Sequence, residues 1–307
     1  MDIVTVPQGM VVALIAFLVN LFTSFQSSVG PDSPLSLGWF HSTIANLSAK
    51  YPTPVTPAPY AFSIWGLIYL WTLAWLIYML TTLCRRNSQG PTYLNPPVVT
   101  IPFLTIFCMN NAASICWLFL WDREYLTRST VALLLIALTL YACLISSLSR
   151  VNQFLSELKS FAEPDLWCYR ILIHNGLAIY TAWATVATTV NMSVAIIYDF
   201  GFSSDTATYV SLTILATDLI LFFVFDLWII DRYTRYVFMV YPTFVWALSA
   251  IMVANGNETS SPAFIYAGVL VSLAFIFFIV KTVLMSIREP VYLLMKKAKL
   301  SSYSRMV

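Results

Sequence analysis

Eight apolar segments, most of them about as long as a membrane-spanning helix, dominate the sequence. They lie at roughly 8–28, 59–83, 98–121, 129–149, 168–198, 208–230, 235–254 and 263–287. A helix needs about 20 apolar residues to cross a bilayer. Charged residues make up 10% of the 307 residues, whereas a soluble domain has about 25%. We therefore expect an all-α, polytopic membrane helical bundle of about eight transmembrane helices, which excludes a soluble or disordered chain.

Basic residues are distributed unequally between the two sides that eight spans would create. The side that holds both termini receives 13 of the 16 lysines and arginines, and the other side receives Lys50, Arg123 and Arg128. The positive-inside rule then places both termini in the cytoplasm. The first segment has no basic residues before it, which favours a spanning helix over a signal peptide. No long soluble segment carries a basic stripe, so nucleic acid is not an expected partner.

Two glycosylation sequons fall on the side with few basic residues. These are Asn46 and Asn257, whereas the sequon at Asn191 lies inside the fifth apolar segment. Glycan acceptors belong on the lumenal or outer face, so this placement favours an endomembrane or plasma membrane over the mitochondrial outer membrane. The segment 289–307 is basic and predicts a cytoplasmic tail attracted to anionic lipid; alternatively, it only fixes orientation. Its basic residues are Lys296, Lys297, Lys299 and Arg305.

Aromatic and polar residues recur at helical spacing in three of the segments. The three stripes consist of Phe62, Trp65 and Tyr69; of Asn110, Ser114, Trp117 and Trp121; and of Tyr180, Trp183, Ala187 and Asn191. Amides facing lipid would lack hydrogen-bond partners, so they should face other helices. The stripes indicate either interhelical packing or an aromatic pocket for a flat apolar ligand. Trp39 and His41, in the first long loop, would lie above such a pocket as a lid.

Few ionisable groups lie within the apolar segments. Asp218 is near the middle of the sixth segment, so it is a candidate proton or ion site or a hydrogen-bonded group that holds helices together. We expect Asp226 and Lys281 to be interfacial anchors. The two histidines, His41 and His174, fall on opposite sides and cannot ligate one haem. The sequence has no catalytic or metal-binding motif that we recognise, so we expect no enzyme and no metal site.

The stripes carry a family resemblance. TPAPYAFSIWGLIYL resembles the second-helix signature of the TspO/MBR family, the tryptophan-rich sensory and translocator proteins, through Thr56, Pro57, Pro59, Phe62, Trp65 and Tyr69. NNAASICWLFLW resembles the third-helix stretch through Asn111 and Trp117, and YTAWATVATTVN resembles the fifth. The resemblance implies a five-helix core over 1–198, three additional helices over 199–288, and a pocket for porphyrins or sterols roofed by the first loop. Two features depart from the family: its usual proline is replaced around Gly176, and no sterol-type pattern follows the fifth helix.

We therefore expect binding, sensing or carriage of a flat apolar ligand, tetrapyrrole- or sterol-like; the alternatives are a proton- or cation-coupled transporter or channel using Asp218, or a structural membrane protein. The one candidate cofactor is a tetrapyrrole, which would be bound as a ligand. Expected partners are the bilayer, a small apolar ligand, anionic lipid and a second copy of the chain in a homodimer. The candidate ligand-binding residues are Trp39, Pro57, Pro59, Phe62, Trp65, Tyr69, Asn110, Asn111, Trp117, Trp121, Tyr180, Trp183, Ala187 and Asn191.

Overall fold

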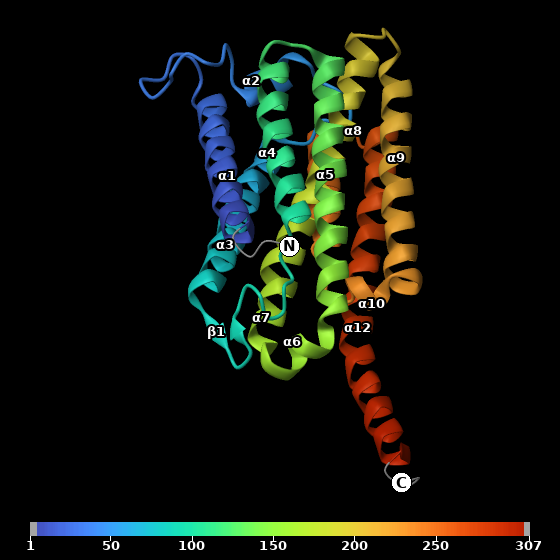
Figure 1. Cartoon of the computed structure of the whole chain (residues 1–307). Helices are drawn as coiled ribbons and strands as arrows, with labels where there is room; N and C mark the ends of the chain where they lie inside the picture. Colours follow the sequence, from blue (N-terminus) through green and yellow to red (C-terminus); the bar gives the residue numbers. More distant parts are fainter. Residues whose placement is uncertain (1–4, 304–307) are drawn as a thin grey trace.

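Helices occupy all eight positions that the hydropathy pattern predicts. The computed structural model describes the backbone of residues 5–303 and the side chains of residues 6–288 (Figure 1). The eight helices are α1 (Thr5–Val29), α3 (Ile64–Cys84), α4 (Ile101–Asp122), α5 (Leu126–Gln153), α8 (Asn175–Tyr198), α9 (Ser204–Val224), α11 (Val240–Ala254) and α12 (Pro262–Tyr303). The prediction of an all-α membrane bundle is confirmed.

Short elements connect these helices. They are α2 (Ile44–Lys50), α6 (Leu155–Phe161), α7 (Glu163–Cys168), α10 (Asp231–Thr234), the 3₁₀ turn η1 (Pro59–Ser63), and the π-helical turns η2 (Tyr169–His174) and η3 (Phe225–Ile229). A two-stranded hairpin of β1 (Arg86–Asn87) and β2 (Gly90–Pro91) follows α3. We call the end of the bundle that carries α2 the α2 end, and the opposite end the hairpin end (Figure 1).

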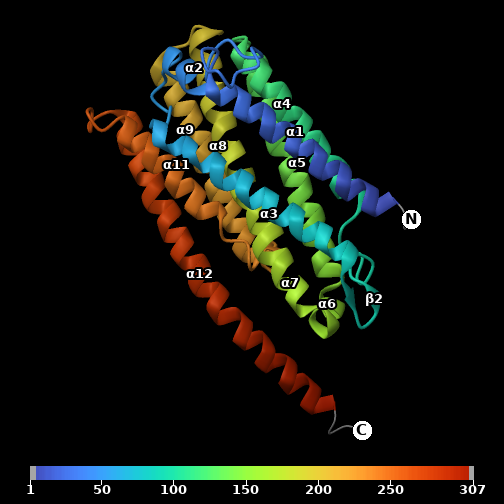
Figure 2. The same ribbon diagram turned by 90° about the vertical axis from the view of Figure 1, so that its left-hand side faces the viewer.

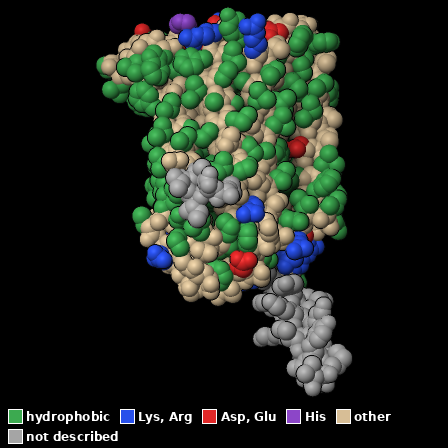
Figure 3. Space-filling view, viewed as in Figure 1, with side chains coloured by type: hydrophobic (Ala, Val, Ile, Leu, Met, Phe, Trp, Pro, Cys, Tyr) green, Lys and Arg blue, Asp and Glu red, His purple; other side chains and the backbone are tan. Residues whose placement is uncertain are grey.

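Six of the eight helices are long and apolar enough to cross a membrane on their own, within the described part of the chain. The other two are α8 and α11. Helix α8 has 24 residues, but its threonines and asparagines lower its hydropathy. Helix α11 has only 15 residues. Both pack inside the bundle, so neighbouring helices shield their polar groups from lipid. Apolar side chains cover the flank of the bundle, and most lysines and arginines lie toward its ends (Figure 3).

Five helices form a closed ring, and three more form a second layer against it. Around the ring, α1 contacts α4, α4 contacts α5, α5 contacts α8, α8 contacts α3, and α3 returns to α1. Helices α9 and α11 pack on the outer side of α8, and α12 packs on both of them. Figure 2 shows α11 and α12 on one side of the molecule and α1 on the other. Helix α8 therefore belongs to both layers, and 16 of its 24 residues are buried.

Gly176, at the start of α8, lies directly against two indole rings of α3. A Cβ atom at this position would lie 2.8 Å from Cδ1 of Trp71 and 3.2 Å from Cδ1 of Trp75. A side chain at position 176 would force the Trp71 indole to shift, so glycine allows the α3 indoles to approach the α8 backbone closely.

The hairpin end shows that one expectation was wrong. Asp226 and Lys281 were expected to be interfacial anchors, but their side chains are 0% and 1% exposed and form an ion pair of 2.6 Å. Tyr241 donates to the other Asp226 oxygen at 2.7 Å, and Lys281 also donates to the carbonyl of Thr234 at 3.0 Å. The pair therefore joins η3, α11 and α12 inside the protein, where hydrogen bonds compensate both charges.

The predicted C-terminal tail continues α12 as a helix through Tyr303. The side chains of Lys296, Lys297 and Lys299 lie outside the described residues, as does Arg305, so attraction to anionic lipid stays a prediction. Likewise, both helices at the ends of the chain point to the hairpin end (Figure 1), but its cytoplasmic orientation stays a prediction.

Candidate functional site

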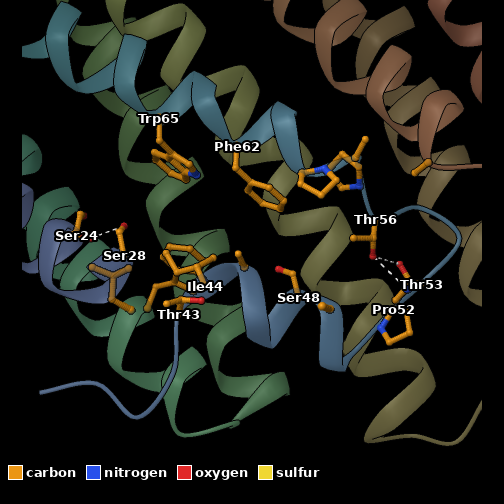
Figure 4. A pocket seen from close by; sticks show the side chains of 18 of the residues that line it. Ser24, Ser28, Thr43, Ile44, Ser48, Pro52, Thr53, Thr56, Phe62 and Trp65 are labelled. Atoms are coloured by element: carbon orange, nitrogen blue, oxygen red, sulfur yellow. Dashed lines mark hydrogen bonds between the residues drawn. The ribbon is translucent and has the colours of Figure 1, made fainter. Parts of the chain in front are cut away.

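A cavity of about 760 Å³ lies at the α2 end of the ring. Helices α1, α3 and α4 form its walls, the end of α11 contributes a further wall, and α2 covers it as a roof (Figure 4). Its volume is within the usual range of small-molecule sites, about 300–1,000 Å³. The lining residues are Ser24, Ser28, Thr43, Ile44, Ala45, Ser48, Ala49, Pro52, Thr53, Thr56, Pro57, Ala58, Pro59, Phe62, Trp65, Tyr69, Trp117, Leu118, Val253 and Ala254.

The proline-rich segment between α2 and α3 forms one edge of this cavity. Prolines keep the chain extended and cannot donate backbone hydrogen bonds. Pro59 begins the turn η1, which leads directly into α3. Helix α11 fixes the segment in place, since the amide of Asn255 donates to the carbonyl of Pro54 at 2.8 Å and the indole of Trp246 donates to Ala61 at 3.1 Å. The second layer therefore positions the edge of a cavity whose other walls belong to the ring.

Trp65 is the centre of an aromatic cluster that joins the three predicted stripes. Its ring lies 6.2 Å from that of Trp117, nearly parallel to it, and 6.3 Å from that of Trp183, nearly perpendicular. Phe62 contacts Trp183 edge-on, and Tyr69 stacks on Trp65 at 5.6 Å. Helices α3, α4 and α8 thus bring their aromatic side chains together, as their spacing in the sequence predicts. These offset and edge-on geometries are the favourable ones for aromatic rings.

A smaller inner cavity of about 50 Å³ adjoins the first one. Phe62, Trp65 and Trp117 line both cavities and so lie between them. Trp121, Trp183, Ala187 and Asn191 line only the inner one. The amide of Asn191 donates to the hydroxyls of Ser129 and Thr130, at 2.7 and 3.2 Å, which fixes its orientation.

Among the described residues, none that lines either cavity is charged. The polar groups of the larger cavity are mainly hydroxyls, such as those of Ser24 and Tyr69, which are hydrogen-bonded at 2.8 Å. The Ser48 hydroxyl points into the cavity from the underside of α2 (Figure 4). The indole N–H groups of Trp117, Trp121 and Trp183 have no hydrogen-bond partner among the described residues. The site can thus surround an apolar, uncharged molecule, with a few donors for orientation.

Four of the predicted ligand-binding residues do not line either cavity. Asn110 donates to the Ile136 carbonyl and the Thr139 hydroxyl, both at 3.0 Å, so it joins α4 to α5. Asn111 accepts a hydrogen bond from Asn20 of α1 at 3.1 Å. These two amides hold the ring together, because an amide among apolar helices must find a partner.

The other two lie behind or outside the aromatic cluster. Tyr180 packs edge-on against Trp65 at 5.8 Å, and its hydroxyl is hydrogen-bonded to Ser114 at 3.1 Å. Trp39 packs on Phe22 at 5.8 Å and is 41% exposed. The roof is therefore α2 rather than the Trp39 loop, because the underside of α2 faces the cavity (Figure 4).

Asp218 also lies away from both cavities. It is half-buried on α9, in the second layer, within electrostatic range of Tyr141 on α5. The sequence predicted this carboxylate as a proton or ion site, and its position gives it no access to the aromatic cluster.

Two carboxylates attach the roof, Asp122 at the end of α4 and Glu124 in the turn that leads to α5, and sequence reasoning missed both. Asp122 accepts hydrogen bonds from the backbone N–H groups of His41 and Ser42, at 2.8 and 3.0 Å. Glu124 pairs with Lys50 at 2.5 Å and accepts from the Tyr51 hydroxyl. These hydrogen bonds, the one from Lys50 first, hold the pKa of Glu124 below its ordinary value. The available signal was the acidic pair at 122 and 124, directly after a span.

Two of the three sequons lie at exposed positions, as glycosylation requires. Asn46 is exposed on α2, and Asn257 is exposed in the turn between α11 and α12. Both lie at the α2 end. Asn191 is 6% exposed within α8. This placement is compatible with modification at the first two positions and not at the third.

Comparison with known families decides what kind of bundle this is. A family model of TSPO-like proteins matches residues 10–281. The chain belongs to the TSPO-like family. The match extends beyond the five-helix ring through α9 and α11 into α12, so the second layer is part of what the TSPO-like model describes. Searches of curated proteins and of solved structures each returned no match.

Proposed function

We propose that this TSPO-like protein binds a flat, apolar and uncharged ligand in the cavity beneath α2. The observation that carries the proposal is the aromatic lining around Trp65, combined with twenty lining residues of which none is charged. Aromatic faces favour a planar molecule, and a few fixed polar groups orient it. Sensing or carriage would follow from reversible binding at this site.

The lack of charge separates two ligand classes. A tetrapyrrole with free propionates would place carboxylates in a site whose described lining residues include no cation. Burying a carboxylate without a partner is costly. A tetrapyrrole with esterified side chains, or a sterol, avoids this cost. The proposal therefore favours neutral molecules over their acidic counterparts.

A titration of the purified protein in lipid nanodiscs tests the proposal. The probes are protoporphyrin IX, its dimethyl ester and cholesterol, and quenching of tryptophan fluorescence reports the two porphyrins, with cholesterol measured by competition. We expect saturable binding of the dimethyl ester, with lower affinity for the diacid. No saturable binding of any probe, or tighter binding of the diacid, would contradict the proposal.

Transport through Asp218 is less well supported. A transport path would need this carboxylate to line it, yet Asp218 is not among the lining residues of either cavity. We further propose that the hairpin end faces the cytoplasm, that Asn46 or Asn257 is glycosylated in a secretory pathway, and that the basic C-terminal segment contacts anionic lipid. The homodimer and the choice of membrane stay predictions from the sequence.

A further inference from the structure

A small polar cavity lies at the hairpin end, opposite the end that carries the aromatic cluster. It has a volume of about 30 Å³ and lies between the end of α5, the turn η2 and α10. One water molecule needs about 10–15 Å³, so the cavity admits a small polar group rather than a whole ligand. Its polar lining residues are Asn152, Arg170, His174, Arg232, Tyr233 and Tyr236. The described lining therefore includes two guanidinium groups and no carboxylate.

Arg170 is held in a fixed orientation beside this cavity. Its guanidinium carbon lies 3.7 Å from the centre of the Tyr236 ring and 4.9 Å from the centre of the Trp167 ring. Stacking on a ring uses the face of a guanidinium, and its N–H groups then point outward in the plane. The turn η2, which carries Arg170, is π-helical, a geometry that is frequent at functional sites. Arg170 is therefore a positioned donor group and not a mobile surface charge.

Arg232 reaches the same cavity from α10. Its Nε donates to the side-chain oxygen of Asn152 at 2.8 Å, so one of its five N–H groups is bonded to a neutral acceptor. Three carboxylates of the hairpin end pair with other cations: Asp165 with Arg85, Asp226 with Lys281, and Asp231 with Arg235 and Arg288. Among the described residues, none of these carboxylates neutralises Arg232.

Exposed aromatic residues mark the level of the membrane at which the cavity lies. Trp167, Trp228 and Tyr233 are exposed at the hairpin end. Tyr233 also lines the cavity, and the Trp167 ring packs on that of Tyr236, with the ring centres 5.3 Å apart. Tryptophan and tyrosine gather at the level of the lipid headgroups. The cavity therefore lies where phospholipids carry their phosphates.

We propose that this cavity binds the phosphate of an anionic phospholipid, with Arg170 and Arg232 as its cationic contacts. The fork of N–H groups on arginine matches two oxygens of a phosphate at once, and basic pockets between membrane helices bind lipid headgroups. Only the phosphate enters, because a volume of about 30 Å³ leaves the glycerol and the acyl chains outside, against the flank of the bundle. The site lies at the other end of the protein from the ligand cavity and does not depend on the function proposed for that cavity.

The two arginines favour a phosphate monoester over a diester. A monoester has a charge of about −1.5 to −2 at pH 7 and three terminal oxygens. A diester has a smaller charge and fewer terminal oxygens, so it forms fewer charge-assisted hydrogen bonds. We therefore expect phosphatidic acid to bind more tightly than phosphatidylserine, and phosphatidylcholine to bind least.

Lipid titration of the full-length protein, followed by native mass spectrometry, tests the site. The probes are dioleoyl phosphatidic acid, phosphatidylserine and phosphatidylcholine, which share their acyl chains. Arg232→Gln changes an exposed side chain, so the fold should be retained. This variant should weaken binding of phosphatidic acid about tenfold, because charge-assisted hydrogen bonds are lost, and should leave binding of phosphatidylcholine unchanged. Unchanged binding of phosphatidic acid would overturn the proposal.

Two controls separate this site from general attraction to a basic surface. Arg86→Gln is the matched control, because Arg86 is exposed at the same end and does not line the cavity; its affinity for phosphatidic acid should equal that of the wild type. The second control replaces four basic residues of the C-terminal segment by Gln: Lys296, Lys297, Lys299 and Arg305. It should lower binding of both anionic lipids to a similar extent and retain the preference between them. Equal effects of Arg86→Gln and Arg232→Gln, or loss of the preference in the tail variant alone, would refute the site.

Arg170→Lys tests the second arginine. It keeps the positive charge but loses the planar group that stacks on Tyr236, so affinity for phosphatidic acid should fall by about three- to tenfold. Thermal unfolding is measured first, because Arg170 is buried; if the variant does not fold, Arg232→Gln decides the test. A folded Arg170→Lys variant with wild-type affinity would contradict the role of Arg170.

Competition with soluble phosphates distinguishes a lipid from a small anion. Inorganic phosphate and glycerophosphate at millimolar concentration should displace little phosphatidic acid, because they lack the acyl chains that lie against the bundle. Displacement at micromolar concentration would show that the cavity takes a soluble phosphate, and would overturn the assignment to a lipid.

Discussion

Trp65 contacts more of the proposed site than its neighbours do, since its ring touches Trp117, Trp183 and Tyr180 and lines both cavities. Trp65→Ala should weaken binding of the dimethyl ester by about 1–3 kcal/mol, through loss of aromatic contact and apolar burial. Fluorescence titration measures this directly. Trp228→Ala is the control, because Trp228 is 67% exposed on η3 at the hairpin end. Equal effects of the two substitutions would contradict a specific role for Trp65.

Glu124 should make the attachment of α2 sensitive to acid. Its pKa is lowered in the folded protein, mainly by the hydrogen bond from Lys50. A group whose pKa is lower in the folded protein stabilises the fold at a pH above its ordinary pKa. This stabilisation is lost as the pH falls through the pKa that the group has in the folded protein. The amide hydrogen-exchange protection factors of residues 44–51 should therefore fall as the pH drops below the ordinary pKa range of glutamate. In the Glu124→Gln variant these protection factors should already be low and show no further fall. Wild-type protection that stays constant below that range would contradict this expectation.

At the scale of the elements, the buried ion pair holds the second layer together. Lys281→Met should destabilise the protein by about 3–5 kcal/mol, because Asp226 would be left buried without its partner. The double variant Lys281→Met/Asp226→Asn should recover much of this loss. Unfolding by denaturing detergent, followed by circular dichroism, measures the differences. A double variant as unstable as the single one would show that the pair does more than compensate two charges.

The helices could be predicted from the sequence because apolar length and helical spacing are local properties. The same spacing correctly placed Trp65, Trp117 and Trp183 on facing sides, since a face is set by periodicity alone. Pairings between distant residues could not be predicted in this way. Asp226 and Lys281 are 55 positions apart, and no local pattern connects them. Asn110 and Asn191 were expected to face other helices, which they do, but sequence spacing could not tell the packing amide of Asn110 from the cavity amide of Asn191.

At the scale of the whole molecule, the sequons at one end of the bundle and the termini at the other predict the orientation of the chain in its membrane. In a eukaryotic secretory host, replacing both Asn46 and Asn257 by Gln should abolish any glycosidase-sensitive mobility shift. Asn191→Gln should have no effect, because Asn191 is 6% exposed inside α8. Tags on both termini should be accessible only from the cytoplasm. A shift that persists in the double variant, or an outward-facing C-terminal tag, would contradict the orientation.

The cavity walls span the chain from Ser24 to Ala254, which has a consequence for biosynthesis. The ring is complete once α8 has emerged from the ribosome, yet the α11 wall and the hydrogen bond from Asn255 to Pro54 require a further 57 residues, from Tyr198 to Asn255. At about 5–20 residues per second, this is a delay of several seconds. During that time the cavity of the nascent chain lacks the wall that Val253 and Ala254 provide. We therefore expect tight retention of a ligand only after the seventh long helix has been inserted.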